Sequence, residues 1–246
     1  MEKVICEDQF FKVDQVLISY IETIQINNPL LYNKILLGPT VYKNIQRAVT
    51  CLKKGGIVLF FSSATYGIAA NAWDENAVDK IYKIKKRDRK NPLSIMTNKI
   101  KYKNIAYPGN DEQLIVDRLI ETFWPGYLGI VCNKNKEAIP DYVNAGFDTI
   151  NMICMDISSE MLTNAADFPI AITSANYSGF EPVRDAYEAI EQFQNEKLID
   201  LFLLGPNSSV GINTTIVKTT DLHNIEILRQ GPVDEAEIQK AIAGLI

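Results

Sequence analysis

Short apolar runs alternate with amphipathic helical patterns along most of this chain, and that alternation is the strongest restriction on its fold. The runs "IVLFF" (57–61) and "LSIMT" (93–97) have the length and composition of buried strands. Helical spacing of apolar residues separates such runs, for example at 40–54 and 111–123. The sequence therefore predicts an α/β fold in which helices pack on a twisted, mixed β-sheet within a single domain.

The expected elements continue to the end of the chain, and the first residues stand apart from them. A helix is expected at 8–26, and 29–39 is expected to be a connection. We therefore expect residues 1–38 to form an N-terminal helical extension and residues 39–246 to form the main domain. Further strands are expected at 127–132, 149–155, 169–173, 198–205, 214–220 and 225–230, and further helices at 75–86, 158–165, from about Asp185, and at 234–243.

Size and composition fit an ordered globular protein. The 246 residues are 47% hydrophobic and carry a formal net charge of −5, so there is enough apolar material for a core. No apolar run approaches the ~18–20 residues of a membrane span, and the first residues lack the pattern of a signal peptide. The cysteines form no CxxC pair and are expected to be small buried residues in a reducing cytoplasm: Cys6, Cys51, Cys132 and Cys154.

His223 is the only histidine, and that count excludes many mechanisms. A histidine-rich zinc site is impossible, and a Ser-His-Asp or Cys-His triad would need His223 itself. We expect His223 in a loop or at a strand edge. Catalysis would therefore depend on lysine, arginine, hydroxyl groups, backbone amides or a metal ion.

The segment "IYKIKKRDRKNPLSIM" (81–96) concentrates positive charge in an acidic protein. A solvated helix end, a nucleic-acid patch and a site for a small anion are all compatible with it. If the backbone is extended before Pro92, Lys85 and Arg87 point the same way and suit a phosphate group. The net negative charge weakens the nucleic-acid interpretation, because phosphate-backbone binding favours a broad basic surface. We expect no stable nucleic-acid binding and no membrane association.

Other polar segments lie next to predicted strands. "SSATYG" (62–67) follows the first buried run, and "SANYSG" (174–179) follows "PIAI", at strand ends where open α/β sheets usually bind ligands. Small residues there let backbone amides approach a ligand closely. Near the end of the chain, Thr214 opens one strand and Arg229 closes the next. Each segment taken alone is also compatible with an ordinary turn or strand end.

Taken together and in order, these segments resemble the YrdC-like family, the threonylcarbamoyl-AMP synthases. The family pattern runs PTDTVYG, Lys-x-Arg before a proline, WPG, Arg-x-Pro, SANxSG, STV and Arg-x-Gly. The stretches that match are "FSSATYG" (61–67), "KKR" (85–87) with Pro92, "WPG" (124–126), "SANYSG" (174–179), "TTIV" (214–217) and "RQG" (229–231). The likeness covers most of the predicted main domain.

The resemblance implies a concave ligand cleft and a nucleotidyltransferase activity. The implied product is L-threonylcarbamoyl-AMP, made from L-threonine, bicarbonate and ATP with release of pyrophosphate, in the pathway to threonylcarbamoyladenosine in tRNA. ATP and Mg²⁺ are the implied cofactors. The implied partners are these small molecules, and a downstream transferase protein is a further candidate.

The resemblance also implies roles for single residues. Lys85 and Arg87 would neutralise the charge that develops on the phosphates. The residues that would hold the nucleotide are Ser174, Asn176, Thr214 and Arg229. The residues that would line the amino-acid side are Ser62, Thr65 and Tyr66.

The chain departs from the family pattern on the amino-acid side. Ser63 and Ala64 stand where the pattern has an acid and a threonine, and Ile153 and Met155 stand where it has an arginine and a proline. An anion contact is therefore missing on that side, whereas the nucleotide-side motifs are better retained. Two alternatives stay open: a divergent carbamoyl-transfer or carbamoyl-adenylate enzyme with another second substrate, and a non-catalytic relative that binds nucleotide or RNA.

Overall fold

The computed structural model describes residues 15–208, 210–221 and 225–245. Its strands are β1 (Ile35–Leu37), β2 (Val58–Phe60), β3 (Gly67–Asn71), β4 (Ser94–Met96), β5 (Leu128–Asn133), β6 (Thr149–Ile153), β7 (Ile170–Ser174), β8 (Leu201–Leu204), β9 (Thr215–Lys218) and β10 (Glu226–Arg229). Its helices are α1 (Gln15–Asn27), α2 (Pro29–Tyr32), α3 (Tyr42–Lys53), α4 (Glu75–Lys85), α5 (Tyr102–Ile105), α6 (Asn110–Phe123), α7 (Ile157–Ala165), α8 (Ala186–Phe193) and α9 (Glu235–Ile242).

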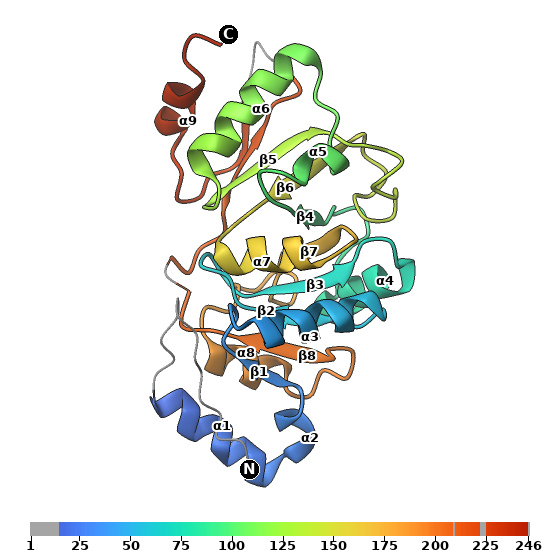
Figure 1. The fold of residues 1–246 in the computed structure, drawn as a ribbon, viewed down its shortest axis with the longest axis vertical. Helices are drawn as coiled ribbons and strands as arrows, with labels where there is room; N and C mark the ends of the chain where they lie inside the picture. The colour runs from blue at the N-terminus through green and yellow to red at the C-terminus, as the bar shows by residue number, and fades with distance from the viewer. Residues whose placement is uncertain (1–14, 209, 222–224, 246) are drawn as a thin grey trace.

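Within the described residues, the ten strands form one sheet in the order β1-β8-β2-β3-β7-β4-β6-β5-β9-β10. The sheet is mixed, because β2 pairs parallel with β8 and antiparallel with β3, and β4 pairs parallel with β6 and antiparallel with β7. Figure 1 shows the sheet following the long axis of the molecule, with α1 near one end and α6 and α9 near the other. The predicted α/β fold with a twisted, mixed sheet is therefore confirmed.

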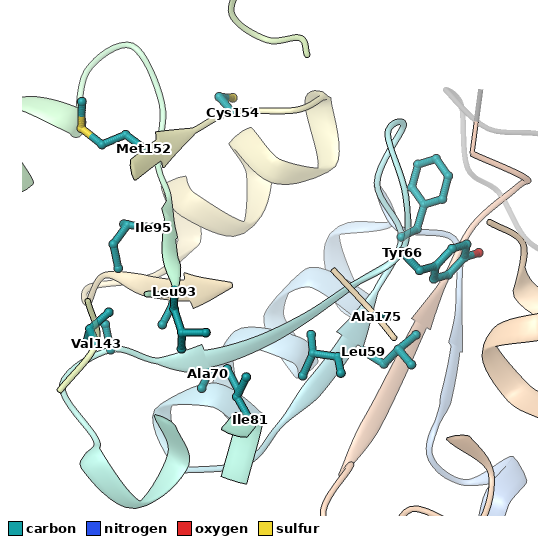
Figure 2. Packing of buried hydrophobic residues seen from close by; sticks show 14 of the residues in the cluster. Leu59, Tyr66, Ala70, Ile81, Leu93, Ile95, Val143, Met152, Cys154 and Ala175 are labelled. Carbon is teal, nitrogen blue, oxygen red and sulfur yellow. The ribbon is translucent and has the colours of Figure 1, made fainter. Parts of the chain in front are cut away.

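Neighbouring residues of the central strands face opposite sides of the sheet. Val58 and Phe60 pack in one apolar cluster with α3 and α7, whereas Leu59 packs in another cluster with α4, α6 and α8. Side chains alternate faces along a strand, so burying both faces requires the continuous apolar runs seen in the sequence. In Figure 2, Ile81 of α4 lies against Ala70 of β3, with Leu59 beside them.

Short polar side chains define where the helices begin. Asp74 accepts a hydrogen bond from the amide of Ala77 at 3.1 Å and so caps α4, as its sequence position indicated. Asp156 caps α7 in the same way through the amide of Ser159. At the other end of α4, Lys86 adopts the left-handed conformation, with φ 50° and ψ 43°, and turns the chain sharply out of the helix.

The structure corrects some of the expected elements. The stretch 29–39, expected to be a connection, contains α2 and the sheet strand β1. Residues 67–71, for which no strand was expected, form β3 in the middle of the sheet. "GIAAN" has weak intrinsic β-propensity, and its pairing with both β2 and β7 supplies what its local sequence lacks.

The expected N-terminal extension is described only from residue 15 onwards. Leu17 and Ile21 of α1 belong to the same apolar cluster as the central strands, and the proposed boundary at residue 38 stays a prediction. The expected positions of Cys6, of His223 and of residues 8–14 lie outside the described residues. None of the helices in the described part of the chain is both long and apolar enough to cross a membrane.

Candidate functional site

A cavity of about 610 Å³ opens on the face of the sheet that carries α3 and α7. Its floor crosses the sheet from Phe60 on β2, through Ser94 on β4 and Asn151 on β6, to Ile216 on β9. Loops at the strand ends form its rim, including residues 87, 90–93 and 213–214. The concave cleft expected from the sequence is therefore present.

Lys85, the last residue of α4, is buried beneath the turn that follows β7. Its ammonium group donates to the carbonyl of Ser174 at 2.5 Å, to the carbonyl of Asn176 at 2.9 Å and to Oδ1 of Asn176 at 2.6 Å. The amide of Ser178 in turn donates to the carbonyl of Lys85. One lysine thus defines the shape of the "SANYSG" turn, and its three protons are matched by three acceptors.

Burial, and to a smaller extent the positive charge of Arg87, lowers the pKa of Lys85 to about 7. The ammonium form is therefore only weakly favoured near neutral pH. An anion bound at the adjacent cavity would stabilise it. Ser174 lines the cavity, whereas Lys85 and Asn176 lie behind the cavity wall.

Arg87 and Arg229 both line the cavity, although they are far apart in the sequence. Arg87 is held by the carbonyls of Asn91 and Pro92, at 3.3 and 3.2 Å. Arg229 donates to the carbonyl of Thr214 at 2.9 Å and to its hydroxyl at 3.1 Å. Partial burial lowers the pKa of Arg229, and the charge of Arg87 lowers it further, so the two guanidinium groups lie close enough to repel. Such a pair suits a ligand with several negative charges.

Close packing of the backbone explains why the "RQG" stretch has a glycine at position 231. A Cβ atom on this residue would lie 2.4 Å from the backbone nitrogen of Thr215. The hydroxyl of Thr215 accepts a hydrogen bond from the Gly231 amide at 2.9 Å. The chain after β10 therefore packs directly on the start of β9, which keeps Arg229 next to Thr214.

The hydroxyl groups expected on the amino-acid side are mostly engaged within the protein. Ser62 donates to the carbonyl of Thr65 at 2.5 Å and does not line the cavity. Tyr66 lines the cavity, but its hydroxyl donates to the carbonyl of Gly205 at 2.9 Å and accepts from the amide of Gly205 at 3.1 Å. Burial raises the pKa of this hydroxyl well above its ordinary value. Thr65 lies on the cavity wall.

Apolar side chains occupy the positions where the sequence departs from the family pattern. Ala64, Ile153 and Met155 are buried, line the cavity and belong to one apolar cluster. Ser63 turns away from them, since its hydroxyl donates to the carbonyl of Met155 at 3.1 Å. Its amide donates to Asp156 at 2.6 Å, which ties the loop after β2 to the start of α7.

Several cavity residues were indicated by no sequence motif, and Phe147 is the exposed aromatic residue among them. Its side chain is 52% exposed and lies on the cavity rim. Asn144 holds this loop by donating to the carbonyls of Phe147 and Thr149, each at 2.6 Å. The buried ammonium of Lys134 donates to Asn144 Oδ1 at 3.0 Å. The sequence did not indicate Phe147 as a cavity residue, because these contacts, rather than a local motif, place it on the cavity rim.

The cavity wall does not by itself fit a protein-held Mg²⁺ ion. Among the described residues, no group of three or more His, Cys, Asp or Glu side chains is arranged to hold a metal. No carboxylate is among the described residues that line the cavity, although Mg²⁺ usually binds one or two carboxylates together with substrate phosphates. Hydroxyls such as those of Ser94 and Thr214 are the oxygen donors that the wall offers.

Comparisons with known proteins agree with the motif order. The family model Sua5_yciO_yrdC, described as telomere recombination, matches residues 50–231. The threonylcarbamoyl-AMP synthase of Pyrococcus abyssi is 30% identical over 200 residues, covering 80% of this chain and 57% of that protein. The Bacillus subtilis threonylcarbamoyl-AMP synthase is 28% identical over 200 residues, covering 80% and 56%.

Among solved structures, the crystal structure of P. abyssi Sua5 complexed with L-threonine is similar in fold. It superimposes with a TM-score of 0.76 and 28% identity, covering 85% of this chain and 60% of that chain. The chain thus spans little more than half the length of the curated relatives named above.

Replacing Lys85 by methionine should lower the free energy of unfolding by about 2–4 kcal/mol, because buried acceptors in the "SANYSG" turn lose their donor. Urea unfolding followed by circular dichroism measures this. Lys83 lies on the same helix, with a side chain 67% exposed and paired with Asp79. Lys83→Met should change stability by less than about 0.5 kcal/mol. Equal effects of the two variants would contradict the structural role of Lys85.

Replacing Tyr66 by phenylalanine should lower stability by about 1–3 kcal/mol, since both polar groups of Gly205 lose their buried partner. The hydroxyl is the only group removed, so the fold should otherwise be kept. Thermal unfolding of the variant and of wild type, followed by circular dichroism, measures the loss. Equal stability of the two proteins would contradict the engagement of the hydroxyl with Gly205.

Proposed function

Because the chain belongs to the Sua5_yciO_yrdC family, we propose that it forms L-threonylcarbamoyl-AMP from L-threonine, bicarbonate and ATP, and releases pyrophosphate. Relatives named as threonylcarbamoyl-AMP synthases support this activity. The observation that carries it is the convergence of Arg87, Arg229 and the Lys85-supported turn on one cavity. Together they make a site for a triphosphate next to space for a second, small substrate.

The chemistry needs charge neutralisation more than a strong base. Bicarbonate takes up a proton and loses water to give CO₂. The amino group of threonine adds to the carbon of CO₂ and gives a carbamate, releasing a proton that balances the one taken up. A carbamate oxygen then bonds to the α-phosphorus of ATP while the bond from that phosphorus to the bridging oxygen breaks. Pyrophosphate leaves with the electron pair. Negative charge moves towards the leaving group, which is where fixed positive charges lower the barrier most.

The residues have distinct proposed parts in this reaction. Arg87 and Arg229 bind the phosphates, and Lys85 holds the turn that presents Ser174 and the amides after it. Thr214 orients Arg229 through two hydrogen bonds. Asn176 positions the turn from behind, with Ser174 donating to its Oδ1 at 2.7 Å. Thr65 borders the amino-acid side, and Ser62 and Tyr66 support it through the loop.

Phe147 is our candidate for the contact with the nucleobase. It is a half-exposed aromatic ring at the cavity rim, and its backbone is held by Asn144. Aromatic side chains stack on bases without needing an exact hydrogen-bond match. A base stacked on Phe147 would leave the phosphates free to reach the two arginines, which line the same cavity.

The proposed cofactors are ATP and a Mg²⁺ ion. Since the cavity wall offers no carboxylate among the described residues, the phosphates of ATP are the expected main ligands of that ion. The proposed compartment is the cytoplasm, supported by the free thiols of Cys51, Cys132 and Cys154. A downstream transferase that receives the adenylate is the proposed protein partner.

The direct test is to incubate pure protein with ATP, Mg²⁺, bicarbonate and L-threonine. Pyrophosphate release and the adenylate, identified by mass spectrometry, should both depend on threonine. Pyrophosphate that forms only with carbamoyl phosphate or another acceptor would indicate a divergent carbamoyl-transfer enzyme. ATP binding without turnover under all conditions would indicate a non-catalytic nucleotide-binding relative.

Replacing Arg87 by alanine should lower kcat for adenylate formation by at least ~10²-fold, as losing a transition-state charge contact typically does. Arg89 is the matched control, because it is exposed, pairs with Asp79 and does not line the cavity. Arg89→Ala should stay within about threefold of wild type, since exposed ion pairs contribute ~0–1 kcal/mol. A normal rate in the Arg87 variant would move the phosphate site elsewhere.

Replacing Phe147 by alanine should weaken ATP binding about tenfold or more, because stacking contributes ~1–3 kcal/mol per base. Binding of inorganic tripolyphosphate, which has no base, should not change. Phe180→Ala is the control, since Phe180 is 71% exposed but lies outside this cavity. Calorimetry with both ligands gives the comparison, and a parallel loss for the two ligands would argue against stacking.

A further inference from the structure

One end of the cavity is an apolar recess formed by Phe60, Ala64, Ile153, Met155 and Ile172. Each of these side chains is at most 9% exposed. The residues come from three strands and two loops, and they continue into the apolar cluster beneath α3 and α7. The recess is therefore part of the hydrophobic core that has been left open to the cavity.

Several polar groups close to this recess are already paired within the protein, whereas Thr65 and Ser94 line the same cavity at its border. The Ser63 hydroxyl donates to the carbonyl of Met155, and the Ser62 hydroxyl donates to the carbonyl of Thr65. Asp156, the nearest carboxylate in sequence to Met155, accepts from the amides of Ser63 and Ser159 and from two serine hydroxyls. The five side chains of the recess therefore present carbon atoms to a ligand, and no charged group is among them.

This composition restricts what the recess can hold. A carboxylate or a phosphate would lose its hydration there without a charged partner. A purine would bury ring nitrogens and an amino group without hydrogen-bond partners, at about 1–3 kcal/mol for each unsatisfied group. A short aliphatic side chain has no such groups and gains roughly 0.8 kcal/mol for each buried methylene.

We propose that this recess is the side-chain subsite for the amino-acid substrate, and that it accepts valine at least as well as threonine. Ala64, Ile153 and Met155 are its specificity-determining residues. The proposal rests on the function proposed above and names the class of its amino-acid substrate: small β-branched amino acids, with no requirement for the hydroxyl.

The physical reason is the similar shape of the two amino acids. Threonine and valine differ by a hydroxyl in place of a methyl group. An apolar pocket that provides no hydrogen bond cannot select the hydroxyl, and it rejects it only about 100-fold at most. A pocket that hydrogen-bonds the hydroxyl would instead reject valine strongly, because its own polar groups would be left unpaired.

The reaction with valine is the one written for threonine. Its amino nitrogen bonds to the carbon of CO₂ and releases a proton. The carbamate oxygen bonds to the α-phosphorus, and pyrophosphate leaves with the electron pair of the broken bond. The side chain of the amino-acid substrate does not take part in the reaction. A change in the preference for valine or threonine therefore reports on the recess alone.

The first experiment compares kcat/KM for threonine, valine, serine and alanine in the full chain, with ATP, Mg²⁺ and bicarbonate present. We expect kcat/KM for valine to lie between that of threonine and about 100-fold above it. Serine and alanine, which lack one β-substituent, should be poorer. A higher kcat/KM for threonine than for valine overturns the inference and leaves the proposed function standing. No turnover with any amino acid overturns both.

The second experiment uses Ile153→Thr and Ile153→Val, which have nearly the same shape and differ in one hydroxyl. The threonine-to-valine ratio of kcat/KM should rise about tenfold or more in Ile153→Thr relative to Ile153→Val. Circular dichroism and thermal unfolding show whether each variant is folded. If Ile153→Thr does not fold, Ala64→Ser provides the same comparison against wild type. Equal ratios in a folded pair would mean that the side chain binds elsewhere.

Discussion

The buried ammonium group of Lys85 is the interaction on which the site depends. It ends helix α4 and, at the same point, satisfies two carbonyls and one amide oxygen of the turn after β7. The left-handed residue Lys86 then redirects the chain, so that Arg87 reaches the cavity wall. Because an unpaired lysine would not be tolerated in such a place, the helix end, the turn and the nearby arginine are positioned together.

The cavity is divided by the chemistry of its walls. The loops at the strand ends bring Arg87 and Arg229 together, and the adjoining strands leave a recess lined by Ile153 and Met155. Positive charge at the rim attracts phosphates, whereas the recess has no partner to offer an anion. This division is consistent with a nucleotide and a small apolar group sharing one cleft. The apolar recess is also the part of the cleft where the sequence departs from the family motifs that it otherwise resembles.

Local sequence was a good guide wherever local interactions decide the structure. Asp74 caps the helix that was expected at 75–86, because capping needs only a side-chain oxygen and an amide three residues away. The strand β3 was missed because alanine and glycine have little β-propensity, and only its two neighbours make it a central strand. Phe147 escaped notice for a similar reason, since contacts with Asn144 position its loop on the cavity rim.

The amino-acid sequence by itself determined the α/β class, the order of the motifs, the absence of histidine-based chemistry outside His223, and the apolar substitutions at Ala64, Ile153 and Met155. The tertiary structure alone decided which partners the polar side chains bond to. Tyr66 looks like a substrate ligand in sequence, but its hydroxyl bonds to Gly205, which is distant along the chain. A hydroxyl group takes the partner that folding brings within reach, and no local pattern contains that partner.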